Sequence, residues 1–341
     1  MDEISTIGLD LAKNVFQVHG ADASGQVVIR KQLRRGQVLA FFRSQLLCVV
    51  AMEACSGAHF WAREIEKLGH VARLIPPAYV KPFVKRQKND MADAEAICEA
   101  AQRPTMRFVA VKSEETQGAA AVFRVRELLI RQRTQTINAL RGHLAEFGEV
   151  SPQGAANARR LIALVEDEGA ALPATMRSAL SALVAVLNHL EEKISELDAE
   201  IACRARENDT ARRLMTIPGI GPLIATALAT LAPPPEMFRR GRDFAAWLGL
   251  TPRQHSTGGK QRMGATTKMG ERSLRRLLII GANAVVTWRS RNGAAPGSWL
   301  AGIIARKPTM LVRVALANKM ARIVWALLAK GGVYRAPAAV A

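Results

Sequence analysis

The sequence predicts a chain of mixed class, with an α/β domain at its N-terminal end and an all-α remainder. Three observations predict this division. Short β-type runs separated by turn residues fill the first third of the chain, two long stretches with helical periodicity follow, and the last third is helical and basic. A length of 341 residues, 49% of them apolar, suffices for about two domains of roughly 150 residues and excludes wholesale disorder.

Residues 1–112 form the predicted α/β domain. Gly20 and the Ala-Ser-Gly at 23–25 mark turns between its first runs, two prolines follow its last strand, and Asn89 is a suitable N-cap for its last helix. We expect, in chain order, strands at residues 6–11, 15–19, 27–30 and 48–52, a helix at about 59–68, a strand at 71–75 and a helix at about 90–102.

Residues 113–210 form a predicted helical region with coiled-coil character. From Met176 to Ile201 the apolar residues alternate spacings of four and three, which is the a/d pattern of a coiled coil. A second long helix at about 115–147 has apolar residues on one side and arginines elsewhere, and a linker at 151–175 rich in Gly, Ala and Pro joins the two. The helices could pair within one chain or across a dimer. We expect a protruding antiparallel pair that also helps the chain to dimerise.

The net charge is concentrated near the C-terminal end. Lys and Arg exceed Asp and Glu by 48 to 29, and residues 239–330 hold 18 of these basic residues but only Asp243 and Glu271 as acids. Such a concentration favours a polyanionic partner, with nucleic acid as the first candidate, because each phosphate contact adds affinity. A basic face that meets only solvent is the simpler alternative. We assign residues 211–330 to a basic helical domain and residues 331–341 to a disordered tail.

Other features of the sequence exclude membrane and secreted classes. No run of about 18 uncharged apolar residues occurs, which excludes an ordinary transmembrane helix. The first residues lack the basic and apolar pattern of a secretory signal. The four cysteines form no CxxC pair and are too few for a disulfide scaffold. We therefore expect a cytoplasmic protein without a membrane partner.

Four carboxylates in the first domain are candidate metal ligands. Asp10 lies in the first strand on the face opposite its apolar residues, Glu53 ends the fourth run, and Asp90 and Asp93 share one side of a helix start. Together they could hold two divalent cations about 4 Å apart, and their hard oxygen atoms select Mg²⁺ or Mn²⁺. The alternative is an ordinary surface aspartate together with helix N-terminal charges. Three early strands with acids on the first and on a later strand favour an RNase H-like fold.

Residues 249–260 form a predicted loop that offers a nucleophile. Ser256 is the candidate hydroxyl, and His255 beside it positions the loop or moves a proton. Nearby cations are Arg253, Lys260 and Arg262. An unactivated serine attacks phosphate poorly, so a base or a metal must take its proton while cations neutralise the transition state. From these residues alone, a flexible Ser-Thr-Gly-Gly turn is the simpler interpretation.

Residues 214–221 resemble a helix-hairpin-helix, in which Gly219 and Gly221 would let backbone N–H groups approach a phosphate. A tight turn between packed helices is the alternative. The arginines of the helix at 115–147 favour a surface that faces nucleic acid, and a solvated helix face is again the alternative. The candidate nucleic-acid contacts are Arg124, Arg126, Arg131, Arg133, Arg141, Gly219, Gly221, Arg253, Lys260, Arg262, Lys268, Arg272, Arg275 and Arg276.

Six segments together resemble the DEDD-type transposases of the insertion-sequence 110/1111 family. They are IGLDLAK (7–13), AMEACSGAH (51–59), KRQKNDMADAEAICEA (85–100), RVRELLIRQRTQTINALRGHLAEFG (124–148), IPGIGPLIATAL (217–228) and WLGLTPRQHSTGGKQRMG (247–264). They occur in the family's order and cover the chain from about residue 4 to residue 330. No position of the family's four acids is altered, since these fall on Asp10, Glu53, Asp90 and Asp93.

The resemblance implies a fold and a chemistry. Residues 1–112 would be similar to Holliday-junction resolvases of the RuvC type, and residues 211–330 would be the transposase domain. Ser256 would be the nucleophile, with the neighbouring Thr257 as the other hydroxyl that fits the motif. The serine would form a phosphoserine link to DNA in a composite site with the metal-binding carboxylates, and another strand would then be joined to the released end.

The resemblance also implies partners. These are DNA at the ends of the element and at its target, and a structured non-coding RNA from the element itself that guides recombination. The coiled coil predicts a homodimer, and recombination of four DNA strands suggests a tetramer when active, in a cytoplasmic, nucleoid-associated protein. Two other functions stay open, a structure-selective endonuclease like a Holliday-junction resolvase, for which Ser256 is incidental, and a non-catalytic nucleic-acid-binding protein.

Overall fold

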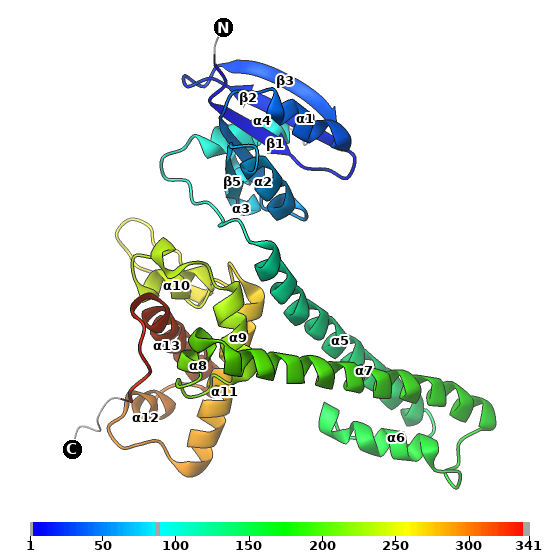
Figure 1. Ribbon diagram of the computed structural model, residues 1–341. Coiled ribbons are helices and arrows are strands. Elements are labelled where there is room, and N and C mark those ends of the chain that lie inside the picture. Colours follow the sequence, from blue (N-terminus) through cyan, green and yellow to red (C-terminus); the bar gives the residue numbers. More distant parts are fainter. Residues whose placement is uncertain (1–2, 86–88, 337–341) are drawn as a thin grey trace. The chain divides into compact units, whose positions relative to one another are not determined.

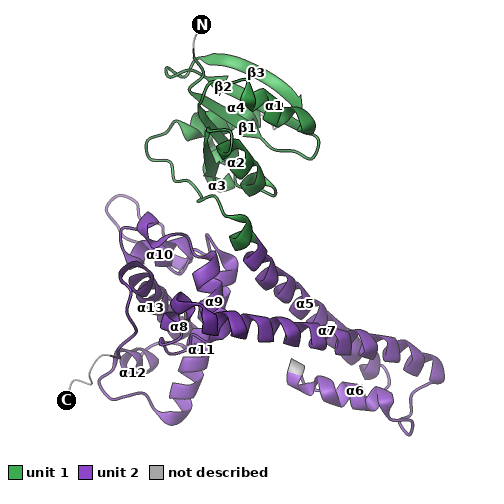
Figure 2. Cartoon of the chain, in the orientation of Figure 1, with its two compact units in different colours: residues 1–117 green, residues 118–341 purple. Residues whose placement is uncertain are grey.

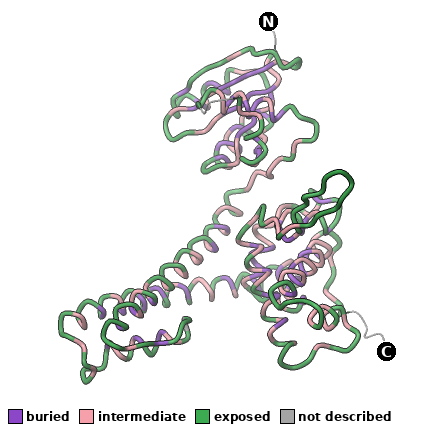
Figure 3. The backbone as a smooth tube through the Cα atoms, turned by 180° about the vertical axis from the view of Figure 1, so that it is seen from behind, coloured by how far each residue is buried: buried purple, intermediate pink, exposed green. Residues whose placement is uncertain are grey.

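The computed structural model describes residues 3–85 and 89–336, and the chain divides into two compact units, residues 1–117 and 118–341 (Figure 2). The first unit is a mixed α/β domain, as predicted, and the second is mainly helical. The predicted domain boundaries at residues 112, 210 and 330 stay predictions. Figure 3 shows buried residues gathered in the sheet and in the helical core.

A five-stranded sheet with the order β3-β2-β1-β4-β5 is the centre of the first unit (Figure 1). The first three strands are antiparallel neighbours, whereas β4 runs parallel to β1 and β5 runs parallel to β4. Its strands are β1 (Thr6–Asp10), β2 (Val15–Ala21), β3 (Val27–Arg34), β4 (Val49–Glu53) and β5 (Val71–Ile75). All five were expected, but β3 continues four residues beyond its predicted end because its backbone pairs with the whole of β2.

Helices cover both faces of this sheet. One face packs against α1 (Val38–Arg43) and α2 (Ala58–Glu66), and the other packs against α4 (Asp90–Ala101). The predicted N-cap of α4 is confirmed, since Asn89 Oδ1 accepts a hydrogen bond of 2.8 Å from the Ala92 amide. Short pieces complete the unit, namely α3 (Pro77–Val80) and the 3₁₀ turns η1 (Arg35–Gln37) and η2 (Lys81–Phe83).

A glycine in β1 lets α4 approach the sheet closely. A Cβ atom at Gly8 would lie 2.2 Å from the Ala94 carbonyl oxygen and 2.6 Å from the Cys98 amide nitrogen, so no larger residue fits there. The start of α4 therefore lies beside the end of β1, and this contact sets the geometry of the site described below.

Two long helices, α5 (Glu114–Ala145) and α7 (Ala174–Glu207), pair antiparallel within one chain (Figure 1). The first residues of α5 belong to the first unit. The predicted linker at 151–175 contains the 3₁₀ turn η3 (Ala155–Asn157) and a further helix, α6 (Ala158–Glu166). The three helices share a core of Ile137, Leu140, Leu144, Ala158, Leu161, Val165, Leu180, Val184 and Leu187. Supercoiling and dimerisation of the pair stay predictions.

The rest of the second unit packs around one apolar core, which also includes Phe123 and Ile201 from the ends of the long pair. Its helices are α8 (Asp209–Leu214), α9 (Pro222–Leu231), α10 (Gly241–Trp247), α11 (Arg272–Asn292), α12 (Trp299–Ile304) and α13 (Thr309–Lys330), with a 3₁₀ turn η4 (Pro235–Met237). The expectation that this part is all-α is wrong at one place, where β6 (Pro252–Gln254) and β7 (Met263–Thr266) form a hairpin.

The end of the chain was predicted to be a disordered tail. Residues 331–336 form no helix or strand, and the rest of that tail, residues 337–341, lies outside the described residues. Among the described helices, none combines the length and the apolar character that a membrane span requires.

Candidate active site

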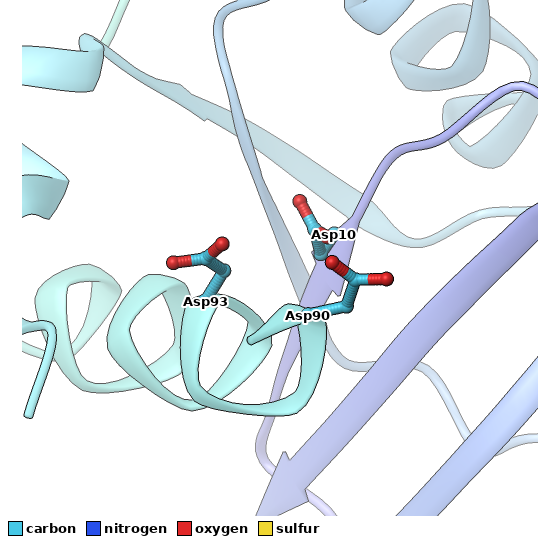
Figure 4. A group of neighbouring side chains, drawn as sticks. All are labelled: Asp10, Asp90 and Asp93. Atoms are coloured by element: carbon cyan, nitrogen blue, oxygen red, sulfur yellow. The ribbon is translucent and has the colours of Figure 1, made fainter. Parts of the chain in front are cut away.

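Three elements bring the predicted carboxylates together. Asp10 ends β1 and Glu53 ends β4. These two strands are parallel neighbours with Leu9 opposite Met52, so the two acids lie next to each other at the carboxyl ends of the strands. Asp90 and Asp93 lie in the first turn of α4 and project toward Asp10 (Figure 4). The i, i+3 spacing places both on one side of the helix, as the sequence predicted.

The carboxylates of Asp10, Asp90 and Asp93 are close enough to share a cation. One oxygen atom from each lies within 4.8 Å of the other two (Figure 4). Burial and the negative charges of Asp93, Asp90 and Glu53, in that order of size, together raise the pKa of the Asp10 carboxyl to about 6. The folded chain therefore keeps four acidic groups near one another at an electrostatic cost that a bound cation would offset.

The donor set fits Mg²⁺ or Mn²⁺. All candidate ligand atoms are carboxylate oxygens, which these hard cations prefer, and no histidine or thiolate belongs to the cluster found among the described residues. Helix N-terminal charge alone would account for Asp90 and Asp93, but it does not account for Asp10 at the end of a strand. The arrangement suits coordination of a divalent cation better than that alternative.

Cys55 was not singled out from the sequence, although it follows Glu53 by two residues. Burial raises the pKa of its thiol, and the nearby charges of Glu53 and Asp10 raise it further. The sulfur donates a hydrogen bond of 3.6 Å to the Ser56 carbonyl oxygen. The Cys55 thiol beside the acids is therefore neutral. Its position two residues after the candidate ligand Glu53 is the feature of the sequence that could have drawn attention to it.

The loop predicted for residues 249–260 is only partly a loop, because it contains β6, and Ser256 lies between this strand and the turn of a hairpin. Gln254 pairs with Met263, and the hairpin continues past the assigned strands, because the His255 amide donates a hydrogen bond of 2.8 Å to the Arg262 carbonyl. Thr257 and Lys260 then form a bridge that closes the turn.

Two glycines make the tight turn of this hairpin. Gly258 and Gly259 have φ values of 53° and 78°, which is the left-handed region that a two-residue type I′ turn requires at both positions. The Ser256 hydroxyl oxygen accepts a hydrogen bond of 3.3 Å from the Arg262 amide, and the side chain is exposed beside the turn. The hairpin therefore presents a fixed hydroxyl at an exposed tip.

The hairpin directs Ser256 and His255 to opposite faces. Side chains alternate along a strand, so Arg253, His255 and Thr257 share one face and Ser256 lies on the other. The His255 ring packs on Gly264, where a Cβ atom would lie 2.8 Å from the ring carbon Cδ2. This contact supports a positioning role for His255 and separates its ring from the Ser256 hydroxyl within the hairpin.

The candidate nucleic-acid contacts fall into two groups. Several cations are exposed and have no carboxylate partner among the residues that the structure describes, namely Arg124, Arg253, Lys260, Arg262, Lys268 and Arg272. Others are bound within the protein. Arg126 binds Asp198 through two hydrogen bonds, and Arg275 donates to the carbonyl oxygens of Leu248 at 3.0 Å and Met269 at 2.9 Å.

Glu127 is the partner of two further candidate cations. Its carboxylate lies 2.9 Å from Arg276 and 3.6 Å from Arg131. Arg141 donates to the Asn138 side chain, and Arg133 is half-buried. The contact of Glu127 with Arg276 joins α5 to α11, whereas Arg131 and Arg141 bind residues of α5 itself. Each contact leaves less of the hydrogen-bonding capacity of its arginine for phosphate.

The two glycines of the predicted helix-hairpin-helix differ in their surroundings. A Cβ atom at Gly219 would lie 2.6 Å from the Gly281 carbonyl oxygen of α11, so close packing of two backbones explains this glycine. Gly221 is the N-cap of α9, is exposed and has open space around its Cα atom. Of the two, Gly221 is better placed to let a phosphate approach.

Comparison with known proteins relates both the N-terminal and the C-terminal part of the chain to transposases. A family model described as "Transposase IS116/IS110/IS902 family" matches residues 211–295, and a DEDD transposase model of the IS110 type matches residues 7–148. The chain is 51% identical over 334 residues to a Pseudomonas aeruginosa protein named "Probable family 20 transposase", with 97% of this chain and 99% of that protein covered.

Two further relatives are named for insertion sequences. The chain is 40% identical over 334 residues to the transposase for insertion sequence element IS1328 of Yersinia enterocolitica, with 98% and 99% of the two chains covered. It is 38% identical over 336 residues to the transposase for insertion sequence element IS1111A of Coxiella burnetii, with 98% and 92% covered.

Proposed function

The chain belongs to the IS116/IS110/IS902 family of transposases, and from this premise we propose that it cleaves and rejoins the DNA of an insertion sequence. In this proposal Asp10, Glu53, Asp90 and Asp93 hold two Mg²⁺ or Mn²⁺ ions, and Ser256 is the nucleophile. The observation that carries it is the approach of three aspartate carboxylates from a strand end and a helix start to within 4.8 Å. The family also implies an RNase H-like fold for the first unit.

The proposed reaction is a transfer of one phosphodiester between hydroxyl groups. The Ser256 Oγ attacks the phosphorus, loses its proton and forms a phosphoserine ester, while a sugar hydroxyl leaves and takes up a proton. A sugar hydroxyl of another strand then attacks the same phosphorus, and Ser256 leaves with a proton. Each ester bond that breaks is replaced by another, so the energy is conserved and no nucleotide hydrolysis is needed.

The divalent cations, when bound, supply the stabilisation of negative charge on the phosphate and the activation of a hydroxyl at neutral pH. The carboxylates orient these ions, and the exposed cations beside Ser256, Lys260 and Arg262, neutralise phosphate oxygens near the hairpin tip. The His255 ring holds the hairpin through its contact with Gly264. Both sites take part in one reaction in this proposal.

Two substitutions test the proposal. Asp10→Asn and Ser256→Ala are each assayed with Mg²⁺ for recombination of DNA that carries element ends and a target, and for a protein–DNA adduct that resists denaturation. We expect both to lose recombination and Ser256→Ala to form no adduct. Full activity of Ser256→Ala would overturn the serine mechanism and leave a resolvase-like endonuclease, in which the carboxylates hydrolyse DNA.

Matched controls keep these results specific. Thr257→Ala changes the adjacent hydroxyl and is expected to retain the adduct, which assigns the nucleophile to Ser256. Glu66→Gln removes an exposed acid at the end of α2 and is expected to leave recombination unchanged. A wild-type protein that is inactive with Mg²⁺ on every such DNA would favour a non-catalytic nucleic-acid-binding protein.

We also propose a structured guide RNA from the element and a homodimer that becomes a tetramer when active. The family resemblance supports the RNA, and the need to recombine four DNA strands supports self-association. Sequencing the RNA that copurifies tests the first point, and the absence of a transcript from the element counts against it. Mass measurement with and without nucleic acid tests the second, and a monomer under both conditions contradicts it.

A further inference from the structure

One part of the sheet face beside the carboxylates is left uncovered. The α4 helix packs over β1 and β2 on this face, whereas β3 lies beyond it at the edge of the sheet. Arg30, Gln32 and Arg34 of β3 are exposed there. The opposite face of β3 is different, since Leu33 is buried in the apolar core.

A row of polar side chains leads from the acids to this uncovered part of the sheet. Asp10 of β1 is opposite Gln17 of β2, and Gln17 is opposite Gln32 of β3. Directly opposite residues on antiparallel strands have Cβ atoms about 5 Å apart, so the three side chains are successive neighbours on one face. Arg34 follows Gln32 by two residues and therefore lies on the same face.

A hollow of about 140 Å³ lies along this row. Gln17, Arg30 and Gln32 line it from the sheet, and Met91 lines it from α4. Val18 and Lys31 also border the hollow, although their side chains lie on the opposite face of the sheet. Met91 follows Asp90 directly and is 61% exposed, so the hollow begins next to the carboxylate cluster. The space beside the acids is thus open toward the edge of the sheet.

The chemistry of this face is suited to phosphate. On this face β3 carries the cations Arg30 and Arg34, and the strand holds no acid. Arg30 has only a loose ion pair, 3.7 Å from Glu95, and Arg34 has no carboxylate partner among the described residues. The amide groups of Gln17 and Gln32 have hydrogen-bond donors to offer. In the proposed function the bound cations offset the charge of the carboxylates, and the phosphates on either side of the cleaved one need donors and cations of their own.

We propose that this face of β2 and β3 binds the backbone of the DNA strand next to the phosphate that is cleaved. Gln17, Gln32 and Arg34 contact its phosphates, and Met91 borders its path. The inference rests on the proposed function, because it takes DNA to be the molecule that approaches the acids. The competing explanation is that charged residues on β3 only protect an edge strand from pairing with other chains.

A pair of substitutions on one strand tests this inference. Arg34→Gln removes a cation from the uncovered face, and Lys31→Gln removes one from the opposite face, where the Lys31 Nζ lies 5.6 Å from the centre of the Phe41 ring. DNA binding by the full chain is measured as a function of salt. We expect Arg34→Gln to lower the slope of log affinity against log salt by about one and to weaken binding several-fold, and Lys31→Gln to change neither.

Gln32→Lys adds a cation to the same face and is expected to steepen the salt dependence by about one and tighten binding. Because it is a gain, a folding defect cannot imitate it. Equal behaviour of Arg34→Gln and Lys31→Gln, with no gain in Gln32→Lys, would overturn the inference. Asp10→Asn, measured in parallel, separates a failure of this inference from a failure of the proposed function. Loss of recombination in that variant keeps the proposed function, whatever the β3 variants do, whereas full recombination there rejects the proposed function itself.

Discussion

The Asp10 carboxylate at the end of β1 faces the Asp93 carboxylate in the first turn of α4, and after burial this pair makes the largest contribution to the raised pKa of Asp10. Two like charges held close together destabilise the folded chain unless a proton or a cation lies between them. Gly8 permits the approach, since it has no Cβ atom that would keep α4 away from β1. The fold thus maintains an arrangement that is unfavourable without a ligand.

Asp10→Asn should therefore stabilise the metal-free protein while it removes activity. At neutral pH the amide relieves the repulsion from Asp93, Asp90 and Glu53, and we expect the free energy of unfolding of the first unit to rise by about 1–2 kcal/mol. Calorimetry without and with Mg²⁺ measures this change. Added Mg²⁺ should raise the melting temperature of the wild type and not that of Asp10→Asn. The control Glu66→Gln should melt like the wild type, and a less stable Asp10→Asn would contradict the argument.

The pKa of Asp10 gives a pH dependence with a defined sign. Its value of about 6 in the folded chain exceeds the ordinary value of 3.8, so between these values the folded state binds more protons than the unfolded state. The contribution of Asp10 to the stability of the metal-free protein is present below the ordinary value and is lost as the pH rises through about 6. The affinity for a divalent cation rises with pH over the same range, because the cation competes with the proton for the Asp10 carboxylate.

We therefore expect Mn²⁺ affinity to increase as the pH rises through about 6 and to level off above it. Titration calorimetry at several pH values on both sides of this point measures it. Asp10→Asn should lose this dependence together with most of the affinity. A Mn²⁺ affinity that stays constant across the range would show that Asp10 is not a ligand.

Most of the first unit could be predicted from its sequence because each element carries a local signal. Turn residues separate the strands, Asn89 caps α4, and the acids fall at element ends. The end of β3 could not be predicted, because an edge strand with polar residues on both faces lacks the alternation that marks a strand. The sequence predicted that the four acids share one site, but the close approach of Asp10 to Asp93 depends on long-range packing that no local signal shows.

The second unit shows where local signals fail. The hairpin at Ser256 has too few apolar residues to indicate strands, and its backbone pairing and its Gly258-Gly259 turn hold it instead. The partner of Arg126 is Asp198, which is 72 residues away, so the sequence could not separate this arginine from a free one. Helix α6 was hidden in a stretch whose Gly and Pro content resembles a linker.

Arg124 and Arg126 should differ in their effect on DNA binding although they are two residues apart on α5. Arg126 is held by two hydrogen bonds to Asp198, whereas Arg124 is exposed without a carboxylate partner among the described residues. We expect Arg124→Gln to lower the salt slope of DNA binding by about one. Arg126→Gln should leave the slope unchanged and lower the stability by about 1–2 kcal/mol. Equal slopes in the two variants would contradict the assignment.

Gly281→Ala should destabilise the second unit strongly. A Cβ atom at Gly281 would lie 2.2 Å from the Gly219 carbonyl oxygen, so α11 and the turn before α9 would have to separate, at a cost of about 3 kcal/mol. Gly142→Ala is the matched control, since this helical glycine of α5 has open space around it and should gain up to about 1 kcal/mol. Denaturant unfolding compares the two. A Gly281→Ala variant as stable as the wild type would show that the two backbones are not held at this distance.

The hairpin turn should control the proposed nucleophile without affecting the helical core. Gly258 has a φ of 53°, a conformation that asparagine tolerates and that a β-branched residue strongly disfavours. Gly258→Asn should therefore retain formation of the Ser256–DNA adduct within about twofold, whereas Gly258→Val should slow it by about tenfold or more, because the bridge between Thr257 and Lys260 is lost. Both variants should melt like the wild type, since the hairpin tip is exposed and contributes nothing to the apolar core. Adduct yield over time, measured with the same DNA for both, decides the matter. If Gly258→Val forms the adduct as fast as Gly258→Asn, the type I′ turn has no part in presenting Ser256.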